Sequence, residues 1–127
     1  MRQAQPGFTL IELMIVITII AILGGIAISM YRAHVRYTKE TALRSDLRSL
    51  REVIDQYTAD KKKEPQALKD LVEAGYLREI PIDPITNSNL TWQVTMDTTG
   101  EQEGGGIINV HSGSNAISQQ AGAYSSW

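Results

Sequence analysis

The hydrophobic pattern predicts one long helix whose two parts suit different surroundings. Residues 8–30 are apolar apart from two glycines and four polar residues, Thr9, Glu12, Thr18 and Ser29. A helix of this length rises about 34 Å at ~1.5 Å per residue, enough to cross a hydrocarbon core of roughly 30 Å. No proline interrupts residues 8–59. We therefore predict a nearly continuous helix that begins as a membrane-spanning or filament-core segment.

Residues 31–59 continue this helix with a single apolar stripe. Its members recur at spacings of four, three, four and three: Leu43, Leu47, Leu50, Ile54 and Tyr57. This periodicity is typical of a helix that covers a globular domain on one side. The other faces are charged, and the i,i+4 spacings of Glu40/Arg44 and Arg48/Glu52 predict ion pairs of a few tenths of a kcal/mol each.

Residues 60–127 show shorter periods and predict a small globular domain. Pro65 suits the first turn of a short helix lined by Leu68, Leu71 and Val72. Gly75 suits the C-terminal cap of that helix. Pro81 and Pro84 then favour an extended, turn-rich stretch.

Two later segments have the alternation of β-strands. Residues 90–96 place Trp92, Val94 and Met96 on one face, and residues 107–111 place Ile108 and Val110 inward, with the turn glycines 104–106 before them. We predict a small antiparallel sheet of two or three strands packed on the helical stripe. The fold class is then α+β, and residues 112–127 form an ordered loop anchored by Tyr124 and Trp127.

Composition and charge exclude several classes of function. The formal net charge is only −2, and the basic run Lys61–Lys63 lacks interleaved aromatic residues, so nothing indicates nucleic-acid binding. The absence of cysteine excludes disulfides and thiolate metal sites. Neither His34 nor His111 has a partner at ligand spacing, and Ser112 lacks an oriented base. We predict no catalytic site and no enzyme activity.

Glu12 is the one charged residue within the apolar segment. A carboxylate at such a position costs on the order of 2.5 kcal/mol or more unless it finds a partner. Cleavage between Gly7 and Phe8 would create an α-amino group four residues from Glu12, which is one helical turn. That amine could pair with its own glutamate or with that of a neighbouring copy.

Residues 7–13, Gly-Phe-Thr-Leu-Ile-Glu-Leu, resemble the processing site of type IV pilins and type II secretion pseudopilins. The resemblance implies that a prepilin peptidase cleaves after Gly7 and methylates the Phe8 amine, and it places the conserved assembly glutamate on Glu12. Residues 1–7 are then the leader. An uncleaved cytoplasmic tail remains an alternative. A secretory signal peptide is disfavoured, because the apolar run exceeds ~7–15 residues and lacks a small-x-small site.

Residues 68–84 resemble the segment after the long helix in major pseudopilins, through Gly75-Tyr76-Leu77 and Asp83-Pro84. This favours a pilin-like, filament-forming subunit of type II secretion. A platform protein, minor pseudopilins and an outer-membrane secretin are implied as partners by the same resemblance. A type IV or competence pilin is the main alternative, and a single-pass membrane enzyme or binding protein is a third.

The membrane topology that we predict disagrees with the positive-inside rule. The N-terminal flank has only Arg2, whereas the far flank has Arg32, Arg36 and Lys39, which taken alone would keep the C-terminal part in the cytoplasm. The short N-terminal tail and the family resemblance instead place the leader there. We expect a single-pass protein of the bacterial inner membrane with residues 60–127 periplasmic, later part of a periplasmic filament.

The last predictions concern two glycines and the calcium ion that the family resemblance implies. Gly24 and Gly25 cost roughly 1 kcal/mol each in a helix and mark either close helix packing or a flexible point. The family usually has a proline near Ser29, which this chain lacks. Major pseudopilins often bind calcium in their C-terminal loop through aspartates, but residues 104–127 contain no Asp or Glu. Because tight calcium sites usually need several carboxylates, we predict no calcium and no other cofactor.

Overall fold

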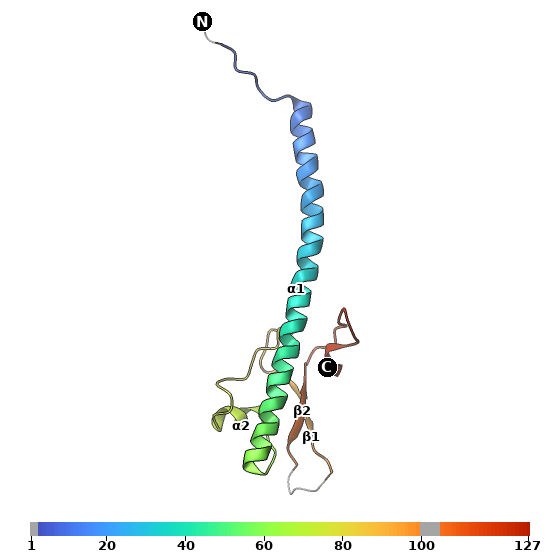
Figure 1. Cartoon of the computed structure of the whole chain (residues 1–127). Helices are drawn as coiled ribbons and strands as arrows, with labels where there is room; N and C mark the ends of the chain where they lie inside the picture. Colours follow the sequence, from blue (N-terminus) through green and yellow to red (C-terminus); the bar gives the residue numbers. More distant parts are fainter. Residues whose placement is uncertain (1–2, 100–104) are drawn as a thin grey trace. The chain divides into compact units, whose positions relative to one another are not determined.

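The computed structural model describes residues 3–99 and 105–127, with elements in the order α1, α2, β1, β2 and a short 3₁₀ helix η1 (Figure 1). Helix α1 spans Leu10–Lys61 without interruption, which confirms the predicted long helix. The chain divides into two compact units, Met1–Arg36 and Tyr37–Trp127, which are described separately. The predicted division of the helix at residue 30 and the leader boundary stay predictions.

The first unit contains the apolar part of α1. Its large hydrophobic side chains, from Phe8 to Tyr31, are all exposed. The helix is long and apolar enough to span a membrane. A helical segment that is hydrophobic on all sides, with its described side chains exposed, needs lipid or other helices around it.

The second unit has one hydrophobic core, built on the predicted helical stripe. The five stripe residues of α1 are buried and pack with Leu71, Trp92, Ile107, Val110 and Tyr124. The strands run beside the C-terminal part of α1 (Figure 1). A long helix packed on a small antiparallel sheet confirms the predicted α+β class.

Helix α2 spans Leu68–Glu73 and begins later than predicted. Pro65 lies before its N-cap, Ala67, and is not in the first turn. The carbonyl oxygen of Pro65 instead accepts a hydrogen bond from the Ile107 amide at 2.8 Å. This contact between distant segments explains why the local preference of proline for a helix start was misleading.

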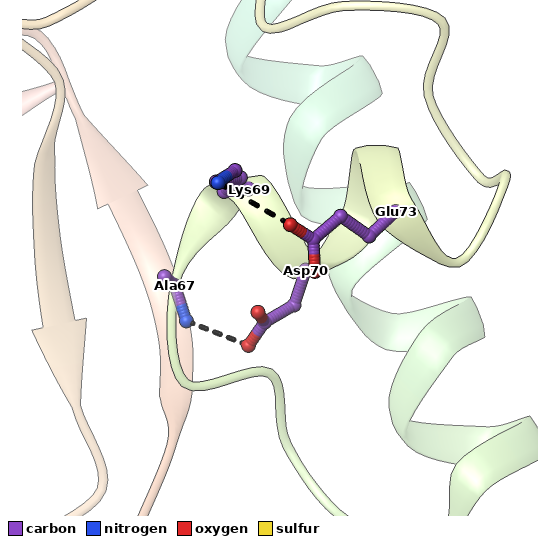
Figure 2. Close-up of polar contacts among 4 residues, drawn as sticks. All are labelled: Ala67, Lys69, Asp70 and Glu73. Carbon is purple, nitrogen blue, oxygen red and sulfur yellow. Dashed lines mark hydrogen bonds and ion pairs between the residues drawn. The ribbon is translucent and has the colours of Figure 1, made fainter.

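The start of α2 is capped by Asp70, whose Oδ2 accepts a hydrogen bond from the Ala67 amide at 3.0 Å (Figure 2). On the exposed face, Lys69 Nζ lies 3.4 Å from Glu73 Oε1 (Figure 2). This is the only ion pair found in the described ranges. The pairs predicted for α1, Glu40/Arg44 and Arg48/Glu52, are therefore wrong.

Gly75 ends α2 as predicted. Its φ of +83° is in the left-handed region that favours glycine. The Tyr76 amide donates to the Leu71 carbonyl at 2.9 Å, and the Gly75 amide donates to the Val72 carbonyl at 3.1 Å. These two bonds form a Schellman motif, which satisfies the last carbonyls of the helix.

Strands β1 (Gln93–Met96) and β2 (Ile107–His111) pair antiparallel, with Val94 opposite Val110 and Met96 opposite Ile107. The register shifts between Thr95 and Met96. Such a bulge places an extra residue on one strand and changes which side chains face the core.

Because of the bulge, part of the prediction of which strand side chains face the core is wrong. Ile108 is 45% exposed, whereas Ile107 and Val110 are buried. Val94 and Met96 are each 40% exposed, because β1 is the outer strand and only Trp92, just before it, reaches the core. The predicted turn glycines fall partly outside the described residues, since Gly104 is not among them.

The C-terminal loop ends in η1, Tyr124–Ser126. Tyr124 is buried, and its ring lies edge-on to Trp127 with 5.2 Å between the ring centroids. This confirms the prediction that these two residues anchor the loop.

Candidate functional site

The start of α1 holds Glu12 in a reciprocal cap with Thr9. Because the helix begins at Leu10, Thr9 is the N-cap residue and Glu12 is at position N3. The Glu12 amide donates to Thr9 Oγ1 at 3.2 Å, and the Thr9 amide donates to Glu12 Oε2 at 3.5 Å. This is a capping box. The Thr-x-x-Glu spacing is a sequence signal for it, which our sequence analysis missed.

The cap gives the Glu12 carboxylate a local role at the positive end of the helix dipole. Its hydrogen bond to the Thr9 amide is long, however, and both residues are exposed. The carboxylate is therefore held at the N-terminal end of α1 and stays accessible to another donor.

The proposed cleavage point lies in an accessible segment. Residues 3–9 have no regular secondary structure and are exposed, and Phe8 is 88% exposed. No atom lies within 4 Å of the position where Gly7 would carry a Cβ. A peptidase can therefore reach the Gly7–Phe8 bond without unfolding the helix.

Gly24 and Gly25 lie within continuous helix. A Cβ added at either position would meet no atom within 4 Å. Ser29 Oγ donates to the Gly25 carbonyl at 3.4 Å, one turn later. No described residue requires glycine at these positions, and the two interpretations, close packing with another helix and bending, stay predictions.

Glu40 is the most unexpected polar residue of the second unit. It is only 2% exposed, although it was predicted to lie on a charged helix face. Its Oε1 accepts hydrogen bonds from the Gln119 amide at 3.0 Å and from the Tyr124 hydroxyl at 2.7 Å. Arg44, its predicted partner, lies instead over the Trp127 ring at 4.5 Å. Local spacing could not show these distant partners.

Asp83, from the Asp-Pro pair, is also fully buried. Its Oδ1 accepts from the Ile85 amide at 2.8 Å, and its Oδ2 accepts from the Ser112 hydroxyl at 2.5 Å. Burial, together with the charge of Asp83, raises the pKa of Asp46 on α1. The network joins the Asp-Pro turn to the end of β2.

These polar groups do not form a recognisable reaction centre. The Ser112 hydroxyl is buried and donates to a carboxylate that also accepts backbone amides, which is a structural arrangement. Across residues 3–99 and 105–127, no group of three or more His, Asp or Glu side chains is placed to hold a metal ion. The geometry supports the interpretation of Asp83 and Ser112 as parts of the fold.

Comparison with known proteins agrees with the N-terminal geometry. Residues 2–28 match the family model of the prokaryotic N-terminal methylation motif. The type II secretion system core protein G of Pseudomonas aeruginosa is 30% identical over 102 residues, covering 68% of this chain and 72% of the relative. The chain therefore belongs to the type IV pilin-like family. Within that family it is similar over most of its length to core protein G of type II secretion systems.

Two further relatives show the range of that family. Core protein G of Klebsiella pneumoniae is 32% identical over 98 residues, covering 65% of this chain and 70% of the relative. The fimbrial protein EcpC of Eikenella corrodens is 32% identical over 110 residues, covering 82% of this chain and 71% of the relative. No solved structure matches the chain.

Proposed function

We propose that this chain is the major pseudopilin of a type II secretion system, a structural filament subunit and not an enzyme. The observation that carries the proposal is the extent of similarity to core protein G. It covers 68% of this chain and recurs in a second core protein G over 65% of the chain, whereas the methylation motif accounts for residues 2–28 alone. The similarity therefore extends well beyond the methylation motif and into the second unit.

Before assembly, the apolar part of α1 holds the subunit in the inner membrane. The leader lies in the cytoplasm and the second unit lies in the periplasm. Prepilin peptidase cleaves the accessible Gly7–Phe8 bond and methylates the new amine of Phe8. The exposed, irregular segment at residues 3–9 and the motif match over residues 2–28 support this step.

Assembly exchanges the partner of Glu12. In the free subunit its carboxylate accepts one long hydrogen bond from the Thr9 amide. In the filament the Phe8 amine of an adjacent subunit takes that place as a charged donor. An unpaired charge in an apolar core is strongly destabilising, so only a subunit in the correct axial position satisfies both groups. The pair sets the register more than it adds net stability.

The role of the Glu12 charge is tested with two substitutions that separate it from the cap. Glu12→Gln keeps a side-chain oxygen for the capping box but removes the charge, whereas Glu12→Ala removes both. We expect both variants to insert into the membrane and to abolish or strongly slow filament formation in a complemented deletion strain. Normal filament yield from Glu12→Gln would show that the charge is not required.

Processing is tested in the same strain. Gly7→Asp should block cleavage and leave no free amine, so SDS gels should show only the full-length chain. The secreted proteins of the deletion strain distinguish the functions. We expect specific enzymes to be lost from the culture supernatant and retained in the periplasm, and complementation to restore them.

A second candidate function is that of a type IV pilin subunit in a surface filament. The similarity to the fimbrial protein EcpC over 82% of the chain favours it. An unchanged culture supernatant, together with loss of surface filaments in the deletion strain, would support this function over the pseudopilin. The Glu12 and Gly7 variants are expected to behave alike in both cases, because the N-terminal chemistry is shared.

A further inference from the structure

The C-terminal segment, defined here as residues 115–127, contacts α1 through a buried carboxylate. Glu40 Oε1 accepts hydrogen bonds from the Gln119 amide and the Tyr124 hydroxyl, at 3.0 and 2.7 Å. Gln119 comes before Gly122 and Tyr124 comes after it, so one carboxylate joins two parts of the segment.

Two arginines of α1 hold the end of the same segment. The Arg44 guanidinium lies 4.5 Å from the centroid of the Trp127 ring. Arg51 Nη2 donates to the main-chain oxygen of Trp127 and, at 2.9 Å, to the Val110 carbonyl. Arg51 Nε donates to Asn109 Oδ1 at 2.7 Å. Residues 40, 44 and 51 of one helix thus fix the C-terminal segment and join it to β2.

The segment also closes on itself through the main chain. The Ser118 amide donates to the Gly122 carbonyl at 2.8 Å, and the Tyr124 amide donates to the Ala116 carbonyl at 3.0 Å. The Trp127 Nε1–H donates to the Ala121 carbonyl at 2.8 Å. The carbonyls of Ala116, Ala121 and Gly122 therefore accept hydrogen bonds within the segment itself.

The donors present do not fit the calcium ion that the family resemblance implies. Calcium takes six to eight oxygen ligands, and tight sites use several carboxylates. Residues 105–127 contain no carboxylate side chain. Glu40 is the acidic residue that bonds to residues 115–127, whereas Glu64 and Asp83 accept hydrogen bonds from Gly106 and Ser112. Glu40 Oε2 is buried without a hydrogen-bond partner in the described part of the chain. Glu40 lines a cavity of about 210 Å³ together with Arg44, whose positive charge opposes a second cation there.

We propose that Glu40 is the organising anion of the C-terminal segment and that this segment folds without a divalent cation. The Glu40 carboxylate, fixed on α1, accepts hydrogen bonds from the segment directly. A metal-dependent loop would instead arrange its own oxygen ligands around a cation. Arg44 and Arg51 hold the end of the segment through Trp127, and Arg44 also lines the cavity beside Glu40. The proposal rests on contacts within residues 37–127 and is independent of which filament the chain forms.

The test is hydrogen–deuterium exchange of the full-length chain in detergent micelles, read separately for peptides from 115–127 and from 43–57. For the wild type we expect no change in either region when calcium is added in excess or removed with EGTA. For Glu40→Ala we expect amides of 115–127 to exchange about tenfold faster or more, because two charge-assisted bonds are lost. The core peptides should keep their protection.

Two matched variants complete the experiment. Glu52→Ala removes an exposed glutamate from the same helix and should leave exchange unchanged. Glu40→Gln keeps an acceptor without the charge and should give an intermediate increase, which remains measurable if Glu40→Ala does not fold. Calcium-dependent protection of 115–127 in the wild type would overturn the proposal. Unchanged exchange of this segment in both Glu40 variants would overturn it as well.

Discussion

The approach of Gly113 to Thr91 gives a sharp prediction about the fold. A Cβ on Gly113 would lie 2.0 Å from the Thr91 carbonyl oxygen and 2.9 Å from its carbonyl carbon. Both are main-chain atoms, so no rotamer change relieves the clash. Gly113 follows Ser112, whose hydroxyl bonds to Asp83, and Thr91 precedes the buried Trp92. Moving residue 113 away from residue 91 therefore disturbs both the hydrophobic core around Trp92 and the hydrogen bond between Ser112 and Asp83.

The cost of Gly113→Ala follows from these contacts. Forcing extra atoms into a well-packed site costs about 1–3 kcal/mol, and losing a hydrogen bond to a charged group costs about 1.5–3 kcal/mol. We expect a total loss of roughly 3–5 kcal/mol, a large part of the typical 5–15 kcal/mol stability of a domain. Urea unfolding of the full-length chain in micelles, followed by tryptophan fluorescence, measures this loss.

Gly75→Ala is the matched control. Gly75 has a φ of +83°, but no atom lies within 4 Å of the position of an added Cβ. Only the left-handed conformation penalises alanine there, by about 1–2 kcal/mol. If Gly113→Ala and Gly75→Ala shift the unfolding midpoint equally, the close approach of residues 91 and 113 is refuted.

Three other substitutions test the electrostatics and the strand register. The raised pKa of Asp46 means that the folded state binds its proton more tightly than the unfolded chain does. That stabilisation is complete below the ordinary value of 3.8 and is lost as the pH rises through the folded pKa. Asp46→Asn should therefore raise stability near neutral pH, by less than about 1 kcal/mol because the group is partly solvated, and should flatten the pH dependence of urea unfolding midpoints. Val110→Ala should cost about 1–3 kcal/mol and Ile108→Ala clearly less, since only Val110 is buried; equal costs would contradict the bulged register.

The sequence predicted the features that depend on local spacing. The stripe from Leu43 to Tyr57 follows the helical period, and its burial needs only a domain on one side. Gly75 was predicted because a left-handed cap strongly favours glycine. The Gly7–Glu12 segment is likewise a local motif. In each case neighbouring residues carry all the information that the prediction used.

Apart from the local capping box of Thr9 and Glu12, the features that were missed depend on contacts between distant parts of the chain. Glu40 is buried because Gln119 and Tyr124 supply its donors, and no periodicity on α1 shows that. Ile108 faces outward because a bulge opposite Met96 changes the alternation of β2. Pro65 interacts with Ile107 across the domain instead of starting a helix. Such pairings become visible only when the chain is folded.

The outer edge of β1 has a practical consequence for handling this protein. In the described residues β1 pairs with β2 alone, so its other edge presents unpaired main-chain groups. The strand carries no charged residue, and its apolar side chains are partly exposed. Concentrated samples can therefore aggregate edge to edge, through contacts unrelated to the N-terminal helix. Thr95→Lys would place a charge on this edge and prevent it from pairing with another chain. Self-association that this substitution abolishes should therefore not be interpreted as filament growth.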